Sequence, residues 1–370
     1  MDKDRFREAA QSTGMGNRFE IEDSPLVESE SPYGLIRANA DELIESAKHF
    51  LPKLPEVHFD FIFDGRPNAF AAKDKGEYFI GITTGMVFLT WLVLGRILSH
   101  RETFPDIGDP QSEIETLPEI SWHTLDAEEL YQGGIAIVSP VDSERQSYGQ
   151  HLFAQLAMFM VGHELAHITR GHVDYLRSER GSSFVSELGW QGSGADATLE
   201  LQALEFDADR RAVLARSVSM YDAVENGAGS KAQPWSKNGQ LFSVESLQFD
   251  WAFAANVMYR LFGDRVFTKL ELENSTHPPM PLRRRMAMDY ANAILLGNWT
   301  KDEETVHRTI GGAIKATEMA FLAIGAPEQG GGFTSAFSEE SNAHVTKIAE
   351  LTEEIAPALN KHAYEEIVQS

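Results

Sequence analysis

Residues 146–176 read QSYGQHLFAQLAMFMVGHELAHITRGHVDYL and give the first indication of how this chain folds. Leu152, Leu156, Phe159 and Met160 recur at the spacing of one helix face, which predicts one long helix over the whole stretch. The middle part of the stretch is almost wholly apolar, so we expect it in the interior. The same reasoning predicts later helices near residues 196–219, 244–262, 279–297, 303–324 and 338–367.

The chain before this stretch has the pattern of a small sheet with helices. In HFDFIFDG, residues 58–65, Phe59, Phe61 and Phe63 alternate with other side chains as they would on a strand. Further elements are expected as follows: a hairpin of strands 68–72 and 77–84 around the turn Lys73–Gly76, helices over 39–50 and 86–99, and a strand over Gly134–Val138. We therefore predict an α+β fold that is mainly helical, with a small N-terminal sheet.

Composition limits the possible functions. The 370 residues include no cysteine, so a metal site would have to use histidine and carboxylate ligands. The formal net charge of -24 argues against nucleic-acid binding, because phosphate backbones repel such a surface. The first residues, MDKDRFREAA, carry charges where a secretion signal needs an apolar core. We expect a cytoplasmic protein in which residues 1–33 form a polar, partly ordered arm.

One uncharged run, Tyr78–Gly95, is long enough to raise the alternative of a membrane span. The first half of the run is rich in β-branched residues and glycine, and Arg96 follows within the same apolar pattern. We interpret the run as a buried strand followed by a buried helix, and we expect no stable insertion into a membrane.

The central chemical motif is His163-Glu164-Leu165-Ala166-His167. Side chains four residues apart lie on one face of a helix, so both imidazoles can reach the same metal ion. Glu164 is placed to take a proton from a water that zinc has made more acidic. The alternative is a helix whose two histidines bind no metal, but two imidazoles in an apolar interior would then need other hydrogen-bond partners.

A catalytic zinc site needs a third protein ligand, and the next predicted helix offers one. In EFDADRRA, residues 205–212, Glu205 and Asp209 share one helix face and Asp207 points away. We therefore expect one Zn²⁺ per chain, bound by both motif histidines and Glu205, with Glu200 as the rival third ligand. Asp209 is expected to accept the second N–H of a ligand histidine. Its alternative role is to pair with a neighbouring arginine, either Arg210 or Arg211.

These motifs resemble those of the gluzincin metallopeptidase family that contains the CAAX prenyl proteases, HtpX and the mitochondrial OMA-type proteases. The resemblance covers roughly residues 58–290 and is specific, because separated segments occur in the family's order. The segments are NAFA at Asn68–Ala71 with the IGITTG that follows, GHELAHITRGH at 162–172, EFDADRRA, and STHPP at Ser275–Pro279 followed by Arg283.

The resemblance implies roles that spacing alone does not. Glu164 would be the general base, and His277 would stabilise the oxyanion of the tetrahedral intermediate. Arg283 would anchor its loop, and His172 would be a helix-end residue that does not bind the metal. The edge of the sheet would be formed by Asn68, Ala69, Phe70 and Ala71, onto which an extended peptide adds as a further strand.

The resemblance also implies a zincin-like domain over residues 34–300, followed by a helical extension over 301–370 that it does not cover. Because the transmembrane helices of the best-known members have no counterpart here, prenylated membrane proteins are not expected as substrates. We predict a soluble zinc-dependent endopeptidase that hydrolyses peptide bonds in proteins or peptides. One alternative is a zinc amidohydrolase acting on small amides, which would need a closed pocket without an exposed strand edge. The other is a catalytically idle binding module, although every catalytic position is present.

Overall fold

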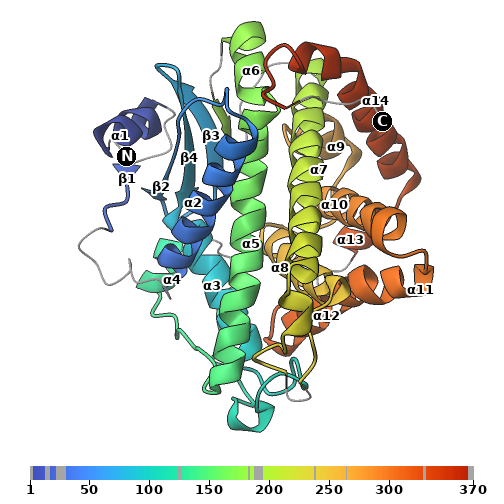
Figure 1. Ribbon diagram of the computed structural model, residues 1–370. Helices are drawn as coiled ribbons and strands as arrows, with labels where there is room; N and C mark the ends of the chain where they lie inside the picture. The colour runs from blue at the N-terminus through green and yellow to red at the C-terminus, as the bar shows by residue number, and fades with distance from the viewer. Residues whose placement is uncertain are drawn as a thin grey trace.

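The computed structural model places a small sheet beside a body of helices (Figure 1). It describes residues 3–12, 17–21, 31–122, 127–181, 184–186, 195–236, 239–263, 265–327 and 331–365. Two long helices, α5 (Ser143–Thr169) and α7 (Ala195–Glu225), pack side by side through the middle of the molecule. The predicted mainly helical α+β fold with a small N-terminal sheet is confirmed.

The sheet has the strand order β1-β2-β4-β3-β5. Its strands are β1 (Asn17–Arg18), β2 (Val57–Phe63), β3 (Ala69–Asp74), β4 (Glu77–Thr83) and β5 (Phe184–Ser186). β2 and β4 run parallel, and the other neighbours run antiparallel. The predicted hairpin of β3 and β4 is confirmed. It turns at Lys75 and Gly76, whose φ angles of 48° and 90° suit a two-residue turn between right-twisted strands.

Residues 3–12 form a helix, α1 (Lys3–Ser12), where we predicted part of a polar, partly ordered arm. Phe6, Ala9 and Ala10 lie on one face of α1 and are buried against Phe70 and Phe79 of the sheet. Their i, i+3, i+4 spacing is that of a helix face, and the neighbouring charges Arg5 and Glu8 pair with Glu77 and Lys75 of the β3–β4 hairpin. Residues 1–2, 13–16 and 22–30 of the predicted arm lie outside the described residues.

The other face of the sheet is covered by α2 (Pro32–Phe50), α3 (Thr84–Leu98) and α5, which pack against β2, β3 and β4. The uncharged run Tyr78–Gly95 is most of β4 followed by most of α3, as we interpreted it. Its buried apolar side chains belong to the main core, except Phe79, which packs against α1. Among the helices of the described ranges, none is long and apolar enough to cross a membrane.

The single helix predicted over residues 146–176 is in fact two helices. Gly171, at a φ of 78°, ends α5, and α6 (His172–Arg180) starts directly after it. Later helices are α8 (Val244–Leu261), α9 (Lys269–Asn274), α10 (Met280–Ile294), α11 (Glu303–Val306), α12 (Gly312–Ala323), α13 (Gly332–Ser335) and α14 (Glu339–Leu359). Shorter turns are α4 (Ala127–Gln132), η2 (Pro110–Ser112), η3 (Ala228–Ser230), and the π-helical η4 (Leu295–Trp299) and η5 (His307–Gly311).

The strand predicted over Gly134–Val138 is wrong, because this segment is irregular. Gly134 has a φ of 74°, which a strand does not contain. The side chain of Ile137 is 56% exposed, so no neighbouring element covers the apolar side of this segment. A run of apolar residues this short does not distinguish a strand from an irregular segment.

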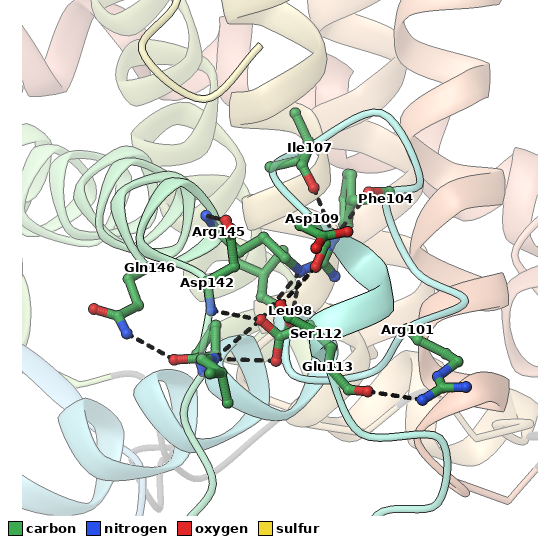
Figure 2. A network of polar contacts seen from close by, with 12 residues as sticks. Leu98, Arg101, Phe104, Ile107, Asp109, Ser112, Glu113, Asp142, Arg145 and Gln146 are labelled. Carbon is green, nitrogen blue, oxygen red and sulfur yellow. Dashed lines mark hydrogen bonds and ion pairs between the residues drawn. The ribbon is translucent and has the colours of Figure 1, made fainter. Parts of the chain in front are cut away.

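The irregular chain that follows α3, residues 99–108, is held in place by Arg145. This arginine is fully buried in the first turn of α5 (Figure 2). Its guanidinium donates hydrogen bonds of 2.7–3.2 Å to the carbonyl oxygens of Leu98, His100, Thr103, Phe104 and Ile107. Glu113, 3.8 Å from Arg145 Nε, accepts hydrogen bonds from the backbone N–H groups of Val141 and Asp142. The irregular loop is thus tied to the start of the helix that carries the HELAH motif.

The C-terminal part of the chain packs back onto the centre of the molecule. α14 lies along α7, and residues 364–365 contact the end of α5. The domain boundaries that we placed near residues 34 and 300 stay predictions.

Candidate metal centre

Two side chains of α5 and one of α7 meet between these helices and could hold a metal ion. They are His163, His167 and Glu205, and all three are buried. The two histidines lie one helical turn apart on the face of α5 that packs against α7. The rival ligand Glu200 lies apart from this group, where it accepts hydrogen bonds from Tyr175 and Arg180.

The donor atoms of these residues lie close enough to one another to bind a single ion. The Nε2 atoms of His163 and His167 are 3.0 Å apart. His163 Nε2 lies 3.3 Å from Glu205 Oε2, and His167 Nε2 lies 3.4 Å from Glu205 Oε1. Ligand atoms about 2.0–2.1 Å from a tetrahedral zinc ion stand about 3.3 Å from one another. The two histidines thus face different oxygens of Glu205, and one atom from each of the three residues lies within 4.8 Å of the other two, close enough to hold one metal ion.

The carboxyl group of Glu205 is held in its charged form. Burial alone would raise its pKa, but the imidazoles of His277, His167 and His163 beside it lower that pKa well below the ordinary value. An ionised carboxylate is the form that binds a metal ion.

Asp209 and Arg283 orient His163. Asp209 Oδ1 lies 2.9 Å from His163 Nδ1, the ring nitrogen that faces away from the donor cluster, as expected for a carboxylate that fixes the tautomer. Arg283 holds Asp209 through hydrogen bonds of 2.7 Å from Nε and 3.0 Å from Nη2, and its Nη2 lies 3.4 Å from Glu205 Oε2. Arg283 belongs to α10, so it anchors the site from a helix, where we expected it to anchor a loop. The alternative partners of Asp209, Arg210 and Arg211, pair with glutamates of the C-terminal region.

A second chain of contacts orients His167, and the sequence analysis missed it. His172 Nδ1 lies 3.0 Å from His167 Nδ1, and His172 Nε2 lies 3.0 Å from Asp207 Oδ2. If Asp207 accepts the Nε2–H of a neutral His172, then His172 Nδ1 accepts the Nδ1–H of His167. This arrangement leaves the lone pair of His167 Nε2 directed at the donor cluster.

Asp207 is itself fixed by Arg170, whose Nε and Nη2 each donate a hydrogen bond of 2.7 Å to its carboxylate. Burial would raise the pKa of Asp207, but the hydrogen bonds from His172 and Arg170 lower it. His172 is the first residue of α6, as expected of a helix-end residue, and it is also fully buried next to a ligand. The turn at Gly171 brings it there, and that turn was not predicted.

Glu164 and His277 lie at the same site. Glu164 is buried and lines an enclosed cavity of about 20 Å³ together with His163, Arg283 and mostly apolar side chains such as Ala69 and Met258. His277 Nε2 lies 3.4 Å from Glu205 Oε1, and its Nδ1 lies 3.1 Å from the hydroxyl of Thr276. The segment between α9 and α10 therefore brings a residue that is distant in sequence to the donor cluster.

The sheet edge at Asn68–Ala71 is less open than expected. β5 pairs with β3 there, in the register Phe70↔Ser186, Ala71↔Val185 and Ala72↔Phe184, so β5 and not β3 is the edge strand. Asn68 and Ala69 lie beyond this pairing, and Ala69 lines the cavity that contains Glu164. The side chain of Phe70 turns to the opposite face and packs across Gly81, where a Cβ atom would stand 2.1 Å from its ring. Residues 182–183 and 187–194, on either side of β5, lie outside the described residues.

Comparison with known proteins finds no relative: no family model matches the chain, and no curated protein and no solved structure matches it either. What this site does therefore has to be argued from its own geometry.

Proposed function

We propose that this chain is a zinc-dependent metalloendopeptidase of the gluzincin kind. The observation that carries the proposal is the buried donor set of His163, His167 and Glu205, whose ligand atoms lie within 4.8 Å of one another, with a buried carboxylate, Glu164, in the same cavity as His163. The motifs that resemble the CAAX protease, HtpX and OMA-type family supply the assignment to that family, and the site geometry is consistent with it.

Zinc held by these three residues would lower the pKa of a water molecule and polarise the carbonyl group of a substrate. Glu164 would take the proton of that water and pass it to the leaving amine. His277, on the Glu205 side of the cluster, would donate a hydrogen bond to the oxygen that becomes negative in the transition state. Asp209 and His172 would keep the two ligand imidazoles in the required tautomers.

The peptide would bind where β3 approaches the cluster. Ala69 shares the cavity with Glu164, so a strand added beside Asn68 and Ala69 would bring its carbonyl groups to the general base. A cavity of about 20 Å³ holds about one water molecule, so any substrate requires the site to open. Displacing β5, which is only three residues long, would extend the available edge to Ala72.

A zinc amidohydrolase that acts on small amides is the second candidate. The occupied edge of β3 and the enclosed cavity favour it, because both are features of a closed pocket for a small molecule. We place the amidohydrolase second for two reasons. The cavity is too small for a small amide as well as for a peptide, and the approach of Ala69 from β3 suits an extended peptide.

Metal content and cleavage of casein test the proposal together. The wild-type protein is expected to hold about one zinc ion per chain and to cleave casein until a chelator removes the metal. Glu205→Gln should lose the zinc, whereas Glu200→Gln, a change on the same helix, should keep it. Equal zinc content in these two variants would show that the third ligand is misassigned.

Glu164→Gln separates metal binding from chemistry. The substitution preserves shape and removes the base, so zinc should remain while turnover falls by about 10²–10⁴-fold. Glu144→Gln, at an exposed position of the same helix, is the matched control and should keep full activity. Hydrolysis of small amides with no cleavage of casein would favour the second candidate, and a zinc-loaded protein that hydrolyses neither would favour a binding module.

A further inference from the structure

The chain returns to the metal centre at residues 362–365, which lie against the end of α5. The backbone N–H of Tyr364 donates a hydrogen bond of 2.9 Å to the carbonyl oxygen of Thr169, and that of Glu365 donates one of 3.4 Å to the same oxygen. A Cβ atom at Gly171 would stand 2.7 Å from the backbone nitrogen of Ala363. Residues 362–365 therefore pack directly on the turn that separates His167 from His172.

The same four residues also contact the other two elements of the site. Both carboxylate oxygens of Glu365 lie 2.8 Å from Nε of Arg211, which belongs to α7 and follows Glu205 and Asp209 on that helix. The hydroxyl of Tyr364 lies 2.9 Å from that of Tyr78 in β4. Residues 362–365 thus connect the helix that carries His167, the helix that carries Glu205, and the sheet.

The end of a helix needs such contacts, because its last carbonyl groups have no partner within the helix and its last turn frays easily. His167 lies in the last turn of α5, two residues before Thr169. Fraying of that turn would move the His167 ring by more than the few tenths of an ångström that a metal site tolerates. A charged pair to α7 and two amide donors to Thr169 oppose this motion.

We propose that residues 362–365 are a positioning segment of the metal centre, which holds the last turn of α5 at the distance from α7 that metal binding requires. This inference rests on the metal site of the proposed function and does not depend on the reaction that the site catalyses. It concerns a region that the motifs shared with the peptidase family do not reach.

Two neighbouring arginines of α7 allow a matched test. Arg211→Met removes the pair with Glu365, whereas Arg210→Met removes a looser contact of 3.8 Å to Glu353 of α14 and leaves residues 362–365 untouched. Zinc affinity is measured on the full chain by competition with a fluorescent chelator. We expect Arg211→Met to weaken zinc binding by about tenfold, in the lower range for residues outside the ligand set, and Arg210→Met to leave it unchanged. Arg211→Lys, which keeps the charge, should restore most of the loss.

Hydrogen exchange distinguishes local fraying of the last turn of α5 from a general loss of stability. In Arg211→Met, backbone amides of residues 166–170 should exchange faster while those of residues 152–160 stay protected. If Arg211→Met does not fold, Glu365→Gln tests the same contact from the other partner. Equal zinc affinity in wild type, Arg211→Met and Glu365→Gln would overturn the inference. A wild-type protein that binds no zinc would overturn the proposed metal site itself, which is a different result.

Discussion

The two carboxylates that stand behind His163 and His167 allow a quantitative test of the proposed metal site. Asp209 contacts His163 directly, at 2.9 Å, whereas Asp207 acts on His167 only through His172. Removing an outer partner of a metal-bound histidine costs about 10–100-fold in affinity, or about 1.4–2.7 kcal/mol. We expect Asp209→Asn to lie near the upper end of this range and Asp207→Asn near the lower end.

The structure gives a reason for the difference. Asp209 also neutralises Arg283, whose Nη2 is 3.4 Å from Glu205. In Asp209→Asn, the guanidinium would compete with the metal for the Glu205 carboxylate, which adds to the loss of orientation at His163. In Asp207→Asn, His172 remains in place and the amide oxygen can still accept its N–H.

Chelator competition measures the zinc affinity of both variants, and Asp222→Asn, at an exposed position of α7, is the control. Thermal unfolding of the metal-free proteins shows whether each variant folds. A wild-type affinity for Asp209→Asn, or a larger loss for Asp207→Asn than for Asp209→Asn, would refute this account of the site.

Three further outcomes are expected. His277→Ala should lower kcat by about 10²–10³-fold at unchanged zinc content and nearly unchanged KM, and a fully active variant would reduce His277 to a loop residue. Val185→Asp should weaken the pairing of β5 with β3 and raise kcat/KM for casein; no change would mean that β5 does not limit access. Arg145→Met should lower the free energy of unfolding by about 3–5 kcal/mol in a denaturant titration, because it leaves a buried Glu113 without this ion pair, and a loss below 1 kcal/mol would contradict that role.

Local spacing was enough to predict which side chains form the group that could hold a metal ion. His163 and His167, and likewise Glu205 and Asp209, are four residues apart within helices, so each pair had to share a face wherever the helices lay. Packing of α5 on α7 brings the two faces together, and Glu205 rather than Glu200 lies on the side of α7 that meets the histidines.

Features that depend on backbone breaks or on very short segments were missed. The part played by His172 and Asp207 requires the turn at Gly171, which the uninterrupted helical pattern of residues 146–176 concealed. β5 has only three residues and lies within a Gly/Ser-rich segment, so no alternation could indicate it. α1 was hidden by charged residues between Phe6, Ala9 and Ala10, whose burial depends on a sheet formed later in the chain.

The contacts behind the two histidines give an independent reason for proposing a metal ion at this site. Asp209 lies 2.9 Å from Nδ1 of His163, and His172 lies 3.0 Å from Nδ1 of His167, so each ring is held from its far side. The Nε2 atoms of both rings then face the Glu205 carboxylate, at 3.3 Å and 3.4 Å. Because an imidazole binds a metal ion through the ring nitrogen that carries no proton, holding the Nδ1 protons on this far side leaves the Nε2 lone pairs for an ion beside Glu205.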